Sequence, residues 1–381
     1  MRRLLTYLAA FWLVLASLAI GLFTADLPFW QRALQLPLAA DTLYLPVAEI
    51  GGVAEALPAV VTAGVPSDPA ALESAVTQAR AAGSRALLVM REGDLVLARY
   101  FGADDAQTLM PAGVIARPVA AMATGFARAE RKLASLDAPV SLYLPEWSDE
   151  PRGRITLRQL LEDTSGLETG GDAREMLRNP PWNTPAKLAD FATSRGMRLV
   201  IGNDFARTAL DFKLRHESGG FYNASPVNAQ LLAVILERAT GIPYEDYLEQ
   251  HLWRPTGGGR AQLALDRRSG MPTAHCCWRA TAPAMMRIIG LLATDGMDGG
   301  RRVLPEGWAR EMTSASRVSA ESAMQLQRLE IGGVTVLTAT DGGHAVWVVP
   351  EKHLAILNIV NSEGTSETAL PEQLLKLFGA T

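Results

Sequence analysis

The chain has 381 residues, of which 48% are hydrophobic and 20% are charged, and its formal net charge is −4. This composition is typical of a globular protein and excludes a disordered chain. The length exceeds what one compact core usually serves, so we expect one two-lobed unit or two domains. The charges form no long run of one sign, which argues against the clustered basic surface of a nucleic-acid-binding protein.

The N-terminus carries the pattern of a membrane-spanning helix. Arg2 and Arg3 precede an uncharged apolar run, Leu4–Phe23, and twenty helical residues extend about 30 Å, the thickness of a bilayer core. Because positive charges stay on the inner side, the rest of the chain is expected in the periplasm or outside the cell. A cleaved signal peptide is the alternative, but no good Ala-x-Ala site closes the run. We therefore favour an uncleaved membrane anchor over residues 1–25.

Residues 26–66 are rich in Pro, Ala and Leu, and their weak periodicity does not decide between a linker and a lead-in lying against the folded body. The folded domain is expected over residues 67–381. It opens with an amphipathic helix, Pro69–Ala82, which ends at Gly83. Two β-rich runs around a Gly-containing turn then predict a hairpin over Ala86–Phe101.

Helices dominate the middle of the chain. The pattern predicts a helix over Pro118–Leu133, and because proline lacks the N–H that a preceding turn would need, this helix is expected to begin at or after Arg117. A short helix follows over Leu157–Leu161. The clearest helix is Ser225–Thr240, with the serine as its cap and helical spacing of its apolar residues. Together these segments predict a helical lobe over about residues 110–240.

The C-terminal part alternates strands and tight turns. Three apolar runs between Gly332 and Asn361 read as three strands, and a helix over Glu367–Phe378 is expected to close the sheet. Helices at both ends of the domain with antiparallel strands between them predict an α/β sandwich beside the helical lobe.

The helical region also carries a family resemblance. The second half of the stretch Met110–Trp147, followed by Arg154–Glu168, is similar to the region just after the active-site helix of the serine β-lactamase-like family. This family includes penicillin-binding DD-peptidases, class C β-lactamases, esterases and 6-aminohexanoate oligomer hydrolases. The resemblance implies a β-lactamase/transpeptidase-like fold with Ser-x-x-Lys near the start of this helix. Counting back from Gly125, the serine position falls on Val114 and the lysine position on Arg117.

These two residues argue against the chemistry that the resemblance implies. A serine hydroxyl attacks only when a neighbouring base removes its proton. Val114 has no nucleophilic atom, and Arg117 stays protonated in proteins. None of the five lysines of the chain has a serine three residues before it, so Ser-x-x-Lys occurs nowhere.

The family's second element, Tyr-x-Asn or Tyr-x-Ser, precedes the next long helix. Anchoring the register on Gly219 and on that helix places Ala224 at the tyrosine position and Pro226 at the Asn/Ser position. Tyr222 lies two residues away and takes over the role only if the register slips, and otherwise packs as an aromatic side chain before the motif.

The third element, Lys-Thr-Gly or His-x-Gly, corresponds to Asp341-Gly342-Gly343, so an acid replaces the cation and would repel an anionic substrate. Close approach of a ligand and close approach of a neighbouring backbone explain the two glycines equally well. If Arg117 and Asp341 both line the groove, they form an ion pair across the former active site. His344 is a further cleft candidate, as a base beside Asp341 or as an edge residue.

Other chemistries find little support. The five histidines show no metal-binding spacing, and neither a metal nor a cofactor is predicted. Cys276 and Cys277 are adjacent, and because neighbouring cysteines rarely bridge each other we expect two quiet thiols. Ser165 lies in Asp-Thr-Ser-Gly-Leu, which resembles the family's His-Thr-Ser-Gly-Leu segment, where the resemblance implies a structural serine.

Three functional hypotheses remain. The first is a catalytically inactive, envelope-located family member that binds a small-molecule, peptide or cell-wall ligand in its cleft. The second is an active serine hydrolase of amides or esters, of the 6-aminohexanoate hydrolase or esterase type, with a relocated nucleophile. The third is a purely structural envelope protein whose cleft is filled by side chains such as Val114 and Arg117.

Overall fold

The computed structural model describes residues 26–35, 45–52, 60–61, 66, 68–171, 176, 185–361 and 369–379. The predicted anchor over residues 1–25 lies outside these residues. Among the residues described, no helix is long and apolar enough to cross a membrane.

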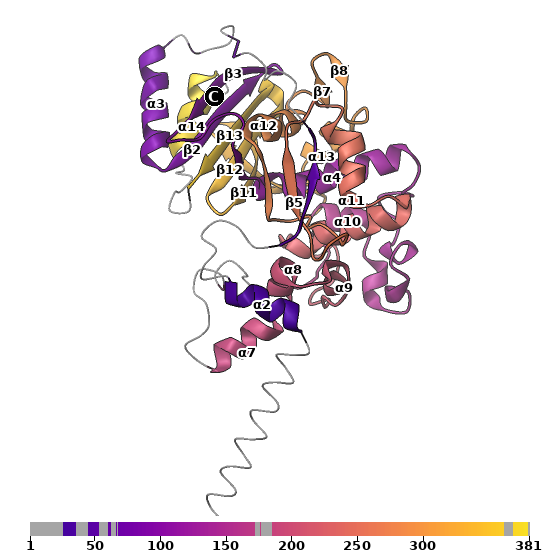
Figure 1. Ribbon diagram of the computed structural model, residues 1–381. Helices are drawn as coiled ribbons and strands as arrows, with labels where there is room; N and C mark the ends of the chain where they lie inside the picture. The colour runs from indigo at the N-terminus through magenta and orange to yellow at the C-terminus, as the bar shows by residue number, and fades with distance from the viewer. Residues whose placement is uncertain are drawn as a thin grey trace, which may run out of the picture.

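An antiparallel sheet organises the molecule (Figure 1). Within the described residues it has the order β3-β2-β13-β12-β11-β10-β9. The strands are β2 (Ser84–Arg91), β3 (Asp94–Tyr100), β9 (Ser322–Ala323), β10 (Leu326–Ile331), β11 (Val334–Asp341), β12 (His344–Val349) and β13 (Leu354–Val360). The predicted hairpin and the three predicted C-terminal strands are confirmed. Pairing of β2 with β13 joins the two ends of the domain.

Helices cover both faces of this sheet, which explains why its central strands are apolar throughout. On one face, α3 (Pro69–Ala81) and α14 (Ala369–Leu377) pack on Leu87 and Val89 of β2. On the other face, α4 (Gly113–Ala129) and α12 (Ala282–Gly290) share a core with Leu88 and Met90 of the same strand. Alternate residues of one strand thus serve opposite cores.

A second sheet holds part of the segment that precedes the domain. Its order is β1-β5-β6-β4, with β1 (Val47–Ile50), β4 (Leu109–Pro111), β5 (Ala261–Ala264) and β6 (Trp278–Thr281). Helix α2 (Leu27–Gln35) packs Phe29 and Ala33 against Met197 and Ile201 of a helix in the lobe. Both described elements before residue 60 therefore lie against the body, as a lead-in does. Strands β7 (Met297–Asp298) and β8 (Arg301–Arg302) form a separate hairpin.

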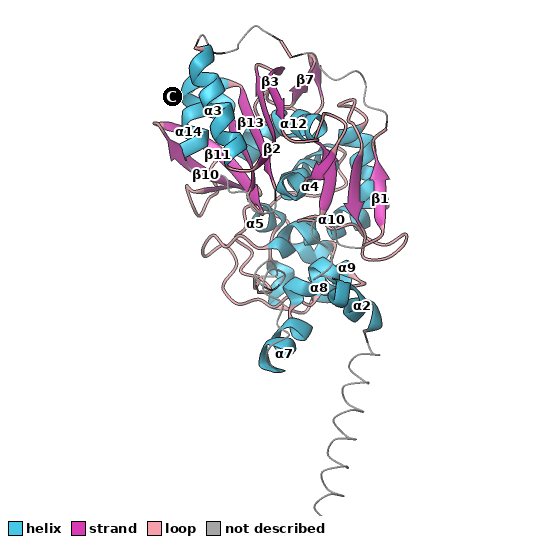
Figure 2. Ribbon diagram, turned by 60° about the vertical axis from the view of Figure 1, so that its left-hand side comes forward, coloured by secondary structure: helices cyan, strands magenta, loops and turns pink. Residues whose placement is uncertain are grey.

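The helical lobe lies below the sheet in Figure 2. Its helices include α5 (Leu157–Leu161), α7 (Pro185–Thr193), α8 (Arg195–Ile201), α9 (Phe205–Leu210) and α10 (Pro226–Thr240), followed by α11 (Tyr244–Leu248) and, later in the chain, α13 (Trp308–Thr313). Short 3₁₀ helices are η2 (Val140–Leu142), η3 (Pro145–Trp147), η4 (Pro151–Arg154) and η6 (Pro350–Lys352), and η5 (Glu249–Trp253) is a π-helix that directly follows α11. Gly125 of α4 lies under the Trp308 ring, where a Cβ would come within 2.3 Å of it, so this glycine permits the contact between α4 and α13.

Two local predictions were wrong. Helix α4 begins at Gly113 rather than at or after Arg117, and Pro118 lies inside it. The turn before the proline is held by tertiary packing, because Val114 and Ile115 are buried in the main core, and this burial offsets the missing hydrogen bond. Ser225 occupies the N-cap position of α10 but makes no side-chain capping hydrogen bond, because its hydroxyl donates to the Glu168 carbonyl at 3.0 Å.

Candidate functional site

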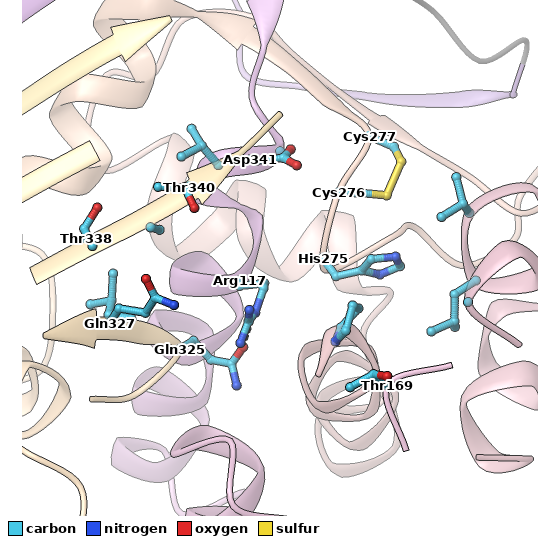
Figure 3. A pocket seen from close by; sticks show the side chains of 18 of the residues that line it. Arg117, Thr169, His275, Cys276, Cys277, Gln325, Gln327, Thr338, Thr340 and Asp341 are labelled. Carbon is cyan, nitrogen blue, oxygen red and sulfur yellow. Dashed lines mark hydrogen bonds between the residues drawn. A yellow bond between two sulfur atoms is a disulfide. The ribbon is translucent and has the colours of Figure 1, made fainter. Parts of the chain in front are cut away.

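A cavity of about 500 Å³ lies between the start of α4, the end of β11, the loop before β6 and the lobe helix α8 (Figure 3). Val114 and Arg117 line it from α4, one helical turn apart and on the same face. Asp341 lines it from the last position of β11. Pro226, at the Asn/Ser position, lines it from the start of α10, whereas Ala224 does not line it. Four of the five positions aligned with the family's motifs therefore meet in one cavity.

The nucleophile position offers only hydrocarbon to this cavity. The Val114 side chain is 2% exposed and belongs to the main core. Among the described residues that line the cavity there is no serine and no lysine. Ser165 does not reach it, because the buried Ser165 hydroxyl donates to Asn228 Oδ1 at 2.7 Å, which is a structural role.

Arg117 is held in a buried polar network. Its guanidinium forms an ion pair with Asp163, and its Nε donates to Gln325 Oε1 at 2.8 Å. Asp163 Oδ1 accepts further hydrogen bonds from Asn228 Nδ2 at 2.8 Å and from Gln325 Nε2 at 3.1 Å. Three side chains thus donate to one carboxylate, which is 1% exposed. Because arginine stays protonated in proteins, Arg117 cannot act as a base.

The Asp163 carboxyl responds to two opposing influences. Burial raises the pKa of Asp163, because the charged form loses its hydration. The ion pair with Arg117 and the hydrogen bonds from Asn228 and Gln325 lower this pKa, because each of them stabilises the charged form. Buried polar groups persist only with such partners.

The hypothesis of an ion pair between Arg117 and Asp341 was wrong. The Arg117 guanidinium instead forms an ion pair with Asp163 and a hydrogen bond with Gln325. Figure 3 shows Arg117 directed toward Gln325, whereas Asp341 lies near the opposite end of the cavity. Sequence analysis missed Asp163 and Gln325. A signal was available for Asp163, since an acid stands at the histidine position of the His-Thr-Ser-Gly-Leu segment while an arginine stands at the lysine position.

Asp341 occupies space that a side chain at residue 113 would fill. A Cβ on Gly113 would come within 1.9 Å of Asp341 Oδ2 and within 3.4 Å of the Cys276 Cα. The first residue of α4 is therefore a glycine because the carboxylate of β11 lies directly against its backbone.

The predicted cleft candidates after Asp341 do not line the cavity. Gly342 and Gly343 have φ values of +59° and +90° and form the two-residue turn between β11 and β12. Such a turn needs positive φ at both positions, which accounts for the glycines without a ligand. His344 is buried, and its Nδ1 accepts the Val360 N–H at 3.2 Å.

Tyr222, rather than Ala224, lines the cavity. The tyrosine is half-buried and shares a side-chain hydrogen bond with Gln327. Burial raises the pKa of Tyr222, and the nearby Asp163 adds to this effect. A tyrosine with a raised pKa stays protonated near neutral pH and donates hydrogen bonds rather than accepting a proton.

The two adjacent cysteines form a disulfide, which corrects the expectation of two thiols. Cys276 and Cys277 are bonded across one trans peptide, with their Cα atoms 3.8 Å apart. Cys277 adopts φ +66°, a conformation uncommon outside glycine. The loop is held by hydrogen bonds from Thr273 Oγ1 to the Cys276 carbonyl and from Trp278 Nε1 to the Thr273 carbonyl, both 2.7 Å long. Both cysteines line the cavity.

A metal site is not apparent in the part of the chain that the structure describes, where no group of His, Cys, Asp and Glu side chains could hold an ion.

The fold agrees with a comparison against protein families. The family model described as Beta-lactamase matches residues 70–379. This chain belongs to the β-lactamase family. The antiparallel sheet between helices and the resemblance stated from the sequence are thereby confirmed.

Individual relatives are distant. A 6-aminohexanoate-dimer hydrolase of Paenarthrobacter ureafaciens is 25% identical over 232 residues, which cover 60% of this chain and 56% of the relative. The chain thus spans about half the length of that relative. Among solved structures, the octameric penicillin-binding protein homologue of Pyrococcus abyssi has a TM-score of 0.61 at 18% identity, covering 81% of this chain and 77% of that one.

A second solved structure, a penicillin-binding protein homologue of Caulobacter crescentus, has a TM-score of 0.58 at 16% identity, covering 87% of this chain and 99% of that one. At such identities the likeness of structures establishes the fold alone.

Proposed function

We propose that this chain is a β-lactamase-family protein without the family's serine hydrolysis, which binds a ligand in the cavity beside α4. The observation that carries the proposal is the identity of residues 114 and 117 in the first turns of α4. Val114 presents an alkyl side chain, and Arg117 is engaged by Asp163 and Gln325. The family's chemistry needs a nucleophile and a base one helical turn apart. Neither residue type occurs at positions 114 and 117.

The cavity that remains suits a small organic molecule or a peptide fragment. Its volume of about 500 Å³ lies in the range of small-molecule sites, which combine apolar walls with a few placed polar groups. Here Val114 and the disulfide supply apolar surface, while Tyr222 and Gln327 supply hydrogen-bonding groups. A peptide or cell-wall fragment, with amides and apolar side chains, matches this mixture.

Envelope location is part of the proposal. The apolar run Leu4–Phe23 behind two arginines is the first support. The second is the bond between Cys276 and Cys277, since disulfides persist in oxidising compartments and are rare in the cytosol.

The test is covalent labelling of the purified full chain with benzylpenicillin and, separately, with a fluorophosphonate, read by intact mass. We expect no adduct, because no serine lines the cavity among the described residues. An active penicillin-binding protein treated in parallel shows that both probes are reactive. A stoichiometric adduct on this chain would contradict the proposal.

A second candidate function, hydrolysis of amides or esters by a relocated nucleophile, draws its support from Tyr222. This side chain lines the cavity although the register placed Ala224 there. The candidate predicts an adduct that maps by peptide mass spectrometry to a residue of the cavity and that decreases in a Tyr222→Phe variant. Labelling that is unchanged by Tyr222→Phe would point to a reactive surface residue instead.

A further inference from the structure

The disulfide between Cys276 and Cys277 has no part in the chemistry discussed above, although both residues line the cavity. Figure 3 shows the bond at the same end of the cavity as Asp341. The chain contains two cysteines in total, so no other thiol can exchange with this bond within one molecule. Any reductant must come from outside, through the cavity or through the adjacent surface.

The two sulfurs have different surroundings. Both residues are half-buried and contact the apolar cluster of Phe29 and Met197, which joins α2 to α8. Cys277 also contacts a second cluster built on Phe205. Because Cys277 is packed on two sides, Cys276 is the sulfur that an incoming thiolate reaches more easily.

The bond also determines the path of the loop that forms this wall. Cys277 takes a positive φ of +66°, a conformation that is unfavourable for an L-residue with a side chain. The chain then enters β6 directly at Trp278. Reduction of the disulfide removes the covalent constraint between the Cys276 and Cys277 side chains, while the neighbouring strand β6 stays in place.

We propose that Cys276–Cys277 is a thiol–disulfide exchange site for small dithiols that enter the cavity. One thiolate of the dithiol attacks Cys276 Sγ, the bond to Cys277 breaks, and Cys277 leaves as a thiolate that takes up a proton. The second thiol of the dithiol then displaces Cys276 from the mixed disulfide. Two electrons and two protons pass to the protein, and the dithiol leaves as a cyclic disulfide. Reduction frees the loop, so the redox state sets the shape of the cavity wall.

The first measurement counts thiols in the native full chain. Treatment with dithiothreitol followed by iodoacetamide is expected to add two alkyl groups per chain, and treatment without dithiothreitol is expected to add none. If the two groups appear only after denaturation, the disulfide is sealed and the proposal is overturned. Two groups without reductant would overturn it as well, because the bond would then not form.

The order of reactivity has its own test in two matched variants. Cys277→Ser leaves the Cys276 thiol, and Cys276→Ser leaves the Cys277 thiol. Alkylation by a maleimide is expected to be several-fold faster in Cys277→Ser, since that variant keeps the less packed sulfur. Equal rates, or the reverse order, would contradict entry at Cys276.

Hydrogen–deuterium exchange separates an exchange site from a structural staple. On reduction, amides of residues 273–278 are expected to exchange faster, while amides of β12 and β13 keep their protection. Faster exchange throughout the sheet would mean that the disulfide stabilises the whole fold, and unchanged exchange at residues 273–278 would mean that the loop does not respond. Either result overturns the proposal. The hydrolase labelling experiment tests a different property, so the two proposals can fail separately.

Discussion

At the residue scale, Arg117 and Asp163 form an ion pair beside the cavity, where the family resemblance implies a catalytic lysine at residue 117. The family's lysine and histidine positions here hold opposite charges that form an ion pair, with Gln325 bonded to both residues. Each residue alone would leave a charge unpaired in a poorly hydrated place, which is costly. The pair is therefore expected to behave as one unit in mutagenesis.

Asp163→Asn is expected to lower the free energy of unfolding by about 3–5 kcal/mol, because it leaves Arg117 without its counter-charge. Arg117→Met in the Asp163→Asn background removes both charges and should cost much less than the sum of the two single changes, Asp163→Asn and Arg117→Met. Urea denaturation of the four proteins measures this coupling. Additive effects would mean that the two residues do not depend on each other.

Gly113 allows a second test at the same scale. Alanine is normally better than glycine in a helix by about 1 kcal/mol, but here its Cβ would meet Asp341 Oδ2 at 1.9 Å. We expect Gly113→Ala to destabilise the protein by about 1–3 kcal/mol through overpacking. In an Asp341→Ala background the same change should be neutral or stabilising. Thermal unfolding decides, and an equal loss in both backgrounds would exclude the steric explanation.

At the scale of elements, the hairpin of β11 and β12 positions Asp341 at the cavity and turns the chain away immediately after it. The turn is built from Gly342 and Gly343, and His344 then enters the buried face of β12. The two glycines therefore form the turn and do not line the cavity, which is lined by Asp341, the residue before them.

Gly342→Ala is expected to cost about 1–2 kcal/mol of stability, which is the price of a positive φ for a residue with a Cβ. No atom lies within 4 Å of that Cβ, so backbone conformation is the whole effect. Gly52→Ala is the matched control, because it also meets no neighbour and is not held at positive φ. Chemical denaturation should separate the two variants, and equal stabilities would contradict the assigned turn.

At the scale of the whole molecule, the body combines a sheet covered on both faces with a helical lobe, and the cavity lies where they meet. The lead-in elements α2 and β1 pack on this body. The proposed anchor directly precedes α2 in the chain, so an anchored protein would hold its lobe close to the membrane.

Cell fractionation tests the anchor. The full chain is expected in the membrane fraction and should resist carbonate extraction. Leu13→Arg places a charge in the middle of the apolar run, where it costs about 2.5–3.5 kcal/mol of insertion free energy, so part of the protein should move to the soluble fraction. Leu34→Arg is the control, since Leu34 is 56% exposed on α2. A soluble full chain, or equal behaviour of both variants, would contradict anchoring.

The sequence by itself determined the elements whose signals are local. The strands β11, β12 and β13, the hairpin of β2 and β3, and the body of α10 follow from apolar periodicity and from turn residues within a few positions. The alignment of Val114 and Arg117 with the family's motif was predicted from one nearby glycine, Gly125, and the structure shows that both residues line the cavity.

Only the tertiary structure shows which distant residues the side chains around the cavity contact. Arg117 binds Asp163, 46 residues away, and Gln325, 208 residues away, and no local pattern carries such distances. Helix α4 begins before Pro118 because burial of its first turn overrides the proline signal. The disulfide of Cys276 and Cys277 likewise depends on a backbone conformation that the surrounding loop holds. Periodicity records which face of an element is buried, whereas pairing across the core depends on contacts that form only when distant segments pack together.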